Sequence, residues 1–270
     1  ASAPAGQVRL RDAWRHCMNS ALIGLATLAC ISAGFAVGLY FRFRLPEHHV
    51  SGESRDTIKQ VIGVIGTVTG MCLGLLVASA KSSYDVKVDA LNRMAANIII
   101  LDRGLAKYGA EASELRSGLR AVIERQRHVL WDEGGLQAEG TRAAAASSAI
   151  ESFQGALHAL HPATEAQRAI HAHATAIVNQ LAVARWEVYV RSGSTTPPVF
   201  LAVLVFWQAA MFAGLGLIAA RNATNSAAII VGAISLAAAL VLILELDTPY
   251  SGMLRIPDTP LRLALEQLGK

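Results

Sequence analysis

The chain has 270 residues, of which 53% are hydrophobic and only 16% are charged, and its mean hydropathy is +0.39. An ordinary soluble domain has about 25% charged residues, so this composition excludes a disordered or fibrous chain and argues against a soluble enzyme. The net charge of +4 is not gathered into a basic stripe, so no nucleic-acid partner is expected.

Four stretches of the sequence contain no Lys, Arg, Asp or Glu. They lie between Arg15 and Arg42, Lys59 and Lys81, Arg191 and Arg221, and Arg221 and Glu245. A membrane-spanning helix needs about 20 predominantly apolar residues, and each stretch is long enough for one. The sequence therefore predicts four spans, at Ala21–Phe41, Val61–Ala80, Val199–Ala220 and Ser226–Glu245. Asn222 precedes the fourth span and is expected to cap its first turn.

The even number of spans places both termini and the central segment on one side of the membrane. More Lys and Arg lie near the span ends on that side than on the other, which favours a cytoplasmic location for the termini. The expected division is 1–80 with the first two spans, 81–197 as a cytoplasmic helical region, 198–247 with the last two spans, and 248–270 as a closing turn and helix.

The central segment has the periodicity of amphipathic helices. Its first helix continues from the second span to Tyr108, and apolar residues recur along it at alternating steps of three and four, namely Leu91, Met94, Ile98, Leu101, Leu105 and Tyr108. Further helices are expected at about 111–131, 142–160 and after Pro162, with Leu115, Leu119 and Val122 on the apolar face of the second. Near the C-terminus, Leu261, Leu265 and Leu268 predict a short helix that lies on the membrane surface or docks on this bundle. The fold class is an all-α membrane protein with a helical bundle inserted between the second and third spans.

The second span carries glycines at steps of three and four, at Gly63, Gly66, Gly70 and Gly74. This pattern has two interpretations, close helix packing or the lining of a conduit. For the second, the candidate lining or gate residues are Ile62, Ile65, Gly66, Thr67, Thr69, Gly70, Met71 and Gly74. Lys81, Ser82 and Asp85 would mark the cytoplasmic mouth.

Two acids, Glu245 and Asp247, close the fourth span. They are either ordinary acids of the membrane interface or functional groups. The sequence contains no phosphate loop, nucleophile elbow or zinc motif, and its histidines and cysteines do not form a ligand pattern. Neither an enzyme activity, nor a metal site, nor a cofactor is expected.

Several stretches resemble a bacterial bestrophin-like family of unknown function. They are 75–85 (LLVASAKSSYD), 101–109 (LDRGLAKYG), 206–224, 244–252 (LELDTPYSG) and 260–262. True bestrophins have an Asn-Pro-Phe-Gly turn followed by acids, whereas residues 248–252 here are followed only by Asp258 before Glu266. An acidic calcium clasp is therefore not expected.

The resemblance implies a homo-oligomer in the bacterial inner membrane, a ring of subunits such as a pentamer, in which the second span lines a path for inorganic ions. The alternative is a non-conducting membrane scaffold or sensor whose helical bundle binds a cytosolic partner. Both interpretations make the lipid bilayer the surroundings of the four spans.

Overall fold

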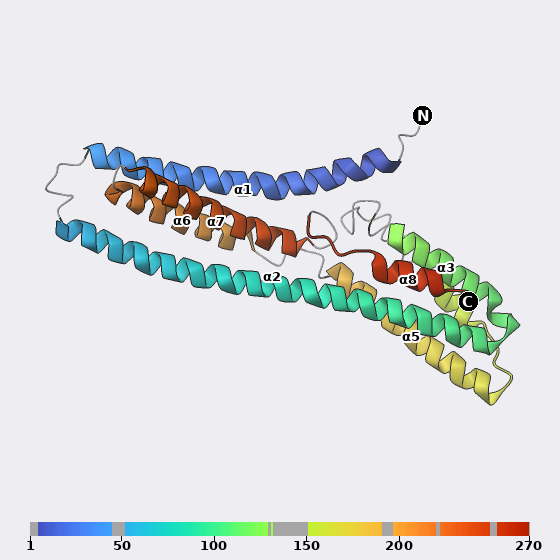
Figure 1. Ribbon diagram of the computed structural model, residues 1–270. Coiled ribbons are helices and arrows are strands. Elements are labelled where there is room, and N and C mark those ends of the chain that lie inside the picture. The colour runs from blue at the N-terminus through green and yellow to red at the C-terminus, as the bar shows by residue number, and fades with distance from the viewer. Residues whose placement is uncertain are drawn as a thin grey trace. The chain divides into compact units, whose positions relative to one another are not determined.

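The computed structural model describes residues 5–44, 52–128, 131, 151–190, 197–219, 222–248 and 253–269. Within these ranges the chain forms helices and turns and no strand. Figure 1 shows the helices, which are α1 (Ala5–Arg44), α2 (Gly52–Tyr108), the short η2 (Ala110–Ala112), α3 (Ser113–Arg127), α5 (Glu165–Val190), α6 (Pro198–Ile218), α7 (Ala223–Asp247) and α8 (Thr259–Gln267). Residues 151–158 are helical as well.

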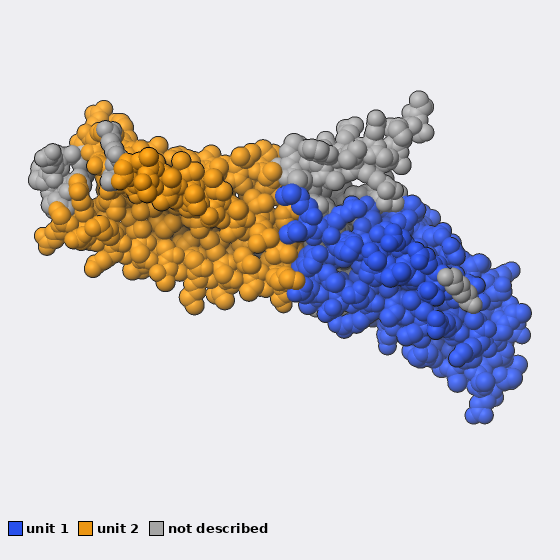
Figure 2. All heavy atoms as spheres, in the orientation of Figure 1, with its two compact units in different colours: residues 1–16, 84–193, 248–270 blue, residues 17–83, 194–247 orange. Residues whose placement is uncertain are grey.

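The chain divides into two compact units, drawn in different colours in Figure 2. The span unit consists of Cys17–Ser83 and Ser194–Asp247, and the bundle unit consists of Ala1–His16, Tyr84–Gly193 and Thr248–Lys270. The 57-residue helix α2 contributes to both units. The four-segment division expected from the sequence separates membrane from cytoplasm, which is a different criterion, and it stays a prediction.

Four helices are long and apolar enough to cross a membrane. They are Ser20–Arg44 of α1, α2, α6 and α7, and they contain the expected spans except for the last two residues of the third. The expected cap of α7 is confirmed, because the backbone amide of Asn225 donates to Asn222 Oδ1 at 2.8 Å. Pro198 occupies the first turn of α6, where its missing N–H costs nothing.

Helix α6 contacts each of the other three helices of the span unit. Gly34 and Gly38 of α1 lie so close to α6 that a Cβ on either would collide with the carbonyl of Ala209 or Ala213. Gly216 of α6 approaches the carbonyl of Phe35 in the same way. The sequence analysis considered close packing only for the glycines of the second span, but the glycines that serve it are on α1 and α6.

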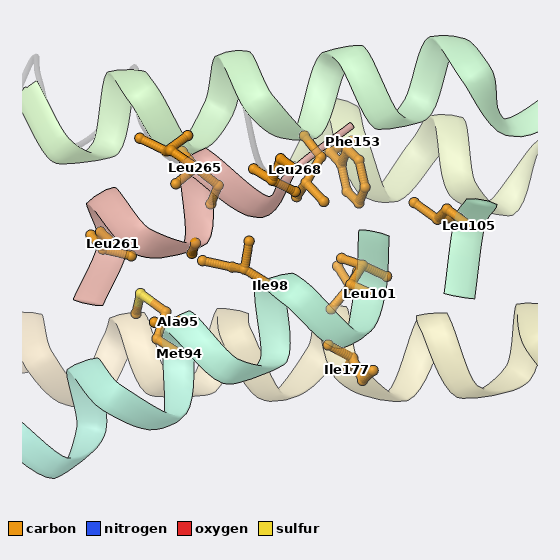
Figure 3. Close-up of a cluster of buried hydrophobic side chains, with 14 of the residues drawn as sticks. Met94, Ala95, Ile98, Leu101, Leu105, Phe153, Ile177, Leu261, Leu265 and Leu268 are labelled. Atoms are coloured by element: carbon orange, nitrogen blue, oxygen red, sulfur yellow. The ribbon is translucent and has the colours of Figure 1, made fainter. Parts of the chain in front are cut away.

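The bundle unit is built around one apolar core, part of which is drawn in Figure 3. The six residues expected to form the apolar seam of α2 are all buried, with exposed fractions of 8% or less. In α3 the periodicity shifts by one residue, because Ile123 is buried together with Leu115 and Leu119, whereas Val122 is only half-buried. The predicted core of the bundle is otherwise confirmed.

The C-terminal helix docks on the bundle. Leu261, Leu265 and Leu268 are buried in the same core as α2 and α3 (Figure 3). Trp131 Nε1 donates to the Ile256 carbonyl at 2.8 Å just before α8 begins. These contacts decide between the two positions that the sequence left open for this helix, in favour of docking.

A buried ion pair ties α2 to α3 and to the end of the chain. The guanidinium of Arg116 donates to both carboxylate oxygens of Asp102, at 2.8 and 3.0 Å, and the amide of Gly269 donates to Asp102 Oδ2 at 3.2 Å. Burial by itself raises the pKa of Asp102, but the hydrogen bonds from Arg116 and Gly269 outweigh it and hold this pKa below its ordinary value of 3.8.

The Asp102→Asn variant is expected to be less stable than the wild type at neutral pH. The lost charge-assisted bonds correspond to about 1–2 kcal/mol, because Arg116 is partly screened by solvent. A carboxyl with a lowered folded pKa stabilises the protein above its unfolded pKa, and this contribution is lost as the pH falls through the folded value. Thermal unfolding measured from neutral pH to below about pH 3.8 should therefore show the two proteins converging in acid.

Glu124→Gln is the matched control for this prediction. Its carboxylate pairs with Arg120 at 3.2 Å, but both side chains are about half exposed, so the pair contributes little. A difference between Asp102→Asn and wild type that is absent at neutral pH, or that persists unchanged in acid, contradicts the assignment.

Candidate functional site

The segment of α2 in the span unit has one side packed against the other helices. Ile62 is half-buried and lies against Gly214, and Gly66 is half-buried opposite Met211. Ile65 is half-buried as well, and Thr69 is only 1% exposed. These four candidate residues of the sequence analysis therefore lie on the packed side of the helix.

The opposite side of α2 carries small residues in a straight row. We call this row the small-residue stripe, and it consists of Gly63, Thr67, Gly70, Gly74, Ala78 and Lys81, all of them exposed. The steps of four, three, four, four and three residues follow the helix axis. The sequence pattern placed Gly66 in this row, but the structure replaces it by Thr67 and turns Gly66 toward α6.

The stripe does not serve packing within the chain. A Cβ added to Gly63, Gly70 or Gly74 would meet no atom within 4 Å in the described part of the structure. Close approach through small residues is thus available to something outside the chain, whether a second copy, lipid or solvent.

A second row of large apolar side chains runs beside the stripe. It consists of Val61, Val64, Val68, Met71 and Leu75, whose exposed fractions lie between 43% and 69%. The exposed half of α2 therefore has two chemically different edges, one small and one bulky. Lys81, Ser82 and Asp85 follow at the C-terminal end of this exposed half and are exposed too.

The two acids of the last span are not at the surface of the chain. Glu245 and Asp247 are each 2% exposed in the last turn of α7. Sequence reasoning missed a third polar group of this kind, Gln208, which is completely buried in α6. The signal was present, because Gln208 is the only amide in an otherwise apolar helix.

In the described ranges, no three His, Cys, Asp or Glu side chains are grouped so that they could hold a metal ion. The rings of His158 and His171 lie 6.4 Å apart, and His171 Nε2 contacts the Leu157 carbonyl at 3.0 Å. The chemistry of the exposed half of α2 is instead that of a surface along which uncharged groups end in a cation, Lys81.

Comparisons with known proteins identify the family. A family model described as a Bestrophin-like domain matches residues 29–261. None of the curated proteins matches the sequence. Two crystal structures share the fold. One, described only as a membrane protein, has a TM-score of 0.64 at 11% identity, and the match covers 92% of this chain and 96% of that one.

The other crystal structure is a mutant of a bacterial bestrophin homolog from Klebsiella pneumoniae. Its TM-score is 0.61 at 14% identity, over 89% of this chain and 99% of that one. At these identities the likeness concerns the fold. The family and the long apolar helices together make this a multi-pass membrane protein. The match over most of the sequence, with the shared fold, shows that the chain belongs to the bestrophin-like family.

Proposed function

We propose that the protein is a homo-oligomeric ion channel in which the exposed half of α2 faces a central pathway. The observation that carries the proposal is the small-residue stripe, which no other part of the described chain covers. Membership of the bestrophin-like family supports it, because the known fold neighbour is a bestrophin homolog. Of the candidate lining residues, Thr67, Gly70, Met71 and Gly74 lie on this exposed half.

The two edges of the exposed half of α2 suit two tasks. Glycines leave room for an ion and its water along an axis, and Thr67 adds a hydroxyl to this edge. The bulky row from Val61 to Leu75 offers apolar area to the neighbouring subunit or narrows the pathway. Lys81 places a positive charge at the end of the stripe, which favours anions there.

The membrane topology belongs to the same proposal. Four spans with the bundle unit on the cytoplasmic side, together with both termini, would place Lys81 at the cytoplasmic mouth, in the inner membrane of a bacterium. A ring of identical subunits, such as a pentamer, closes the pathway. No enzyme activity is proposed.

Reconstitution tests this function directly. The purified protein is incorporated into liposomes, ion flux is measured by dye quenching, and the subunit number is determined by mass measurement in detergent. Flux above that of protein-free liposomes from a particle of several subunits is expected. A monomer, or an oligomer with no flux for either small anions or small cations, overturns the proposal.

One observation favours the alternative of a non-conducting scaffold or sensor. An open groove of about 620 Å³ lies between α3 and residues 152–160 of the bundle unit, with Glu111 and Glu114 among its lining residues. Such a groove suits a partner with an apolar and basic surface. The liposome measurement separates the two functions, because a scaffold gives no flux.

A further inference from the structure

Two buried polar side chains in the span unit have no partner among the described residues. Gln208 of α6 is 0% exposed, and neither its Oε1 nor its Nε2 has a hydrogen bond. Thr69 of α2 is 1% exposed, and its Oγ1 has none either. A buried polar group without a hydrogen bond costs free energy, so each of them requires an explanation.

The two side chains lie at the same level of the helix bundle. Ile62 lies against Gly214 and Met211 lies opposite Gly66, so α2 and α6 run antiparallel in a fixed register. Continuing this register by one helical turn brings Thr69 level with Gln208. Because both are fully buried in the same unit, they occupy the same layer of its interior.

The Thr69 hydroxyl differs from the other hydroxyls of the spans. Thr27, Thr67 and Ser235 each donate to the backbone carbonyl four residues earlier, at 2.8 to 2.9 Å. Such a bond satisfies a hydroxyl within its own helix. Thr69 does not form it, so its hydroxyl is left for a group outside α2.

The neighbouring helix leaves space in this layer. The ring of Phe212 lies 3.7 Å from the position of a Cβ on Gly232, which fixes the level of α7 against α6. The buried residues of α7 near this level include Ala233 and Ala237. Small side chains here leave room beside the amide that a larger residue would fill.

We propose that Thr69 and Gln208 form a buried water-binding site that joins α2 to α6. One water molecule can accept from Nε2, donate to Oε1 and bond to the Thr69 hydroxyl, which gives the three hydrogen bonds typical of a buried water. A metal cation fits less well, because two side-chain oxygens are too few and the amide protons repel it. An anion would be buried without a positive charge.

A double-mutant cycle tests the site. Thr69→Val and Gln208→Leu remove the polar atoms and keep similar side-chain volumes. Each single variant is expected to lower the apparent melting temperature in detergent by about 2–4 °C, because it leaves the other group with fewer partners. The double variant is expected to lose clearly less than the sum of the two.

Thr67→Val is the matched control, since Thr67 is exposed and its hydroxyl bonds to the Gly63 carbonyl at 2.9 Å. Its effect should add to that of Gln208→Leu without coupling. Density for one ordered water between α2 and α6 in a high-resolution structure, lost in Gln208→Leu, completes the expected result. Additive effects in the Thr69 cycle overturn the proposal, and so does a layer in which the two side chains bond directly with no water. Both readouts are independent of ion flux, so the site and the channel proposal fail or stand separately.

Discussion

Replacing Gly38 with leucine is expected to abolish the folded protein, and replacing it with alanine is expected to lower the melting temperature markedly. A single Cβ at this position collides with the carbonyl of Ala213, which is backbone and cannot rotate away. Overpacking of this kind costs about 1–3 kcal/mol or more, which corresponds to about 2–12 °C in the melting temperature. Size-exclusion chromatography and thermal unfolding in detergent measure both results.

Gly63→Ala is the control, because a Cβ at Gly63 meets no described atom within 4 Å. It should retain the wild-type elution profile and melting temperature. If Gly38→Ala is as stable as the wild type, the close contact between α1 and α6 is not the one described above.

Gly70→Leu is expected to reduce ion flux about tenfold or more, equivalent to raising the barrier to conduction by about 1.4 kcal/mol. Gly70 lies in the middle of the small-residue stripe, where added side chains would narrow the pathway from every subunit at once. Because nothing in the described chain fills the space, the single chain should still fold. Flux is measured in liposomes at equal protein content.

Ala238→Leu is the matched control for this variant. Ala238 is exposed on α7, so the substitution adds a side chain of similar size to a different face of the span unit. Its flux should equal that of the wild type. Equal flux from Gly70→Leu and wild type would remove the stripe from the pathway, whereas loss of assembly in Gly70→Leu would place it at a subunit contact.

The sequence was sufficient to predict the helices because charge and periodicity are strong signals. Runs without a charged residue can only be buried or in lipid, and they correspond to the four long apolar helices. The steps of three and four from Leu91 to Tyr108 identified the core of the bundle unit, because every residue of that seam is buried.

The faces of the apolar helices could not be predicted, because apolar residues surround them on all sides. Gly38 and Gly70 look alike in the sequence, yet one touches the backbone of α6 and the other faces open space. Gln208 could be noticed in the sequence, but its burial depends on the register between α2 and α6. Periodicity carries no information on that register when the helix is uniformly apolar.

Modification of an introduced cysteine in the stripe tests the central claim most directly. Ala78→Cys is prepared in a background without Cys17, Cys30 and Cys72, and a water-soluble thiol reagent is added to conducting liposomes. If the stripe faces an aqueous pathway, Ala78→Cys reacts rapidly and its modification blocks the flux, whereas Ala238→Cys neither reacts nor changes it. An unreactive Ala78→Cys, or a modified one with unchanged flux, would show that α2 does not line the pathway.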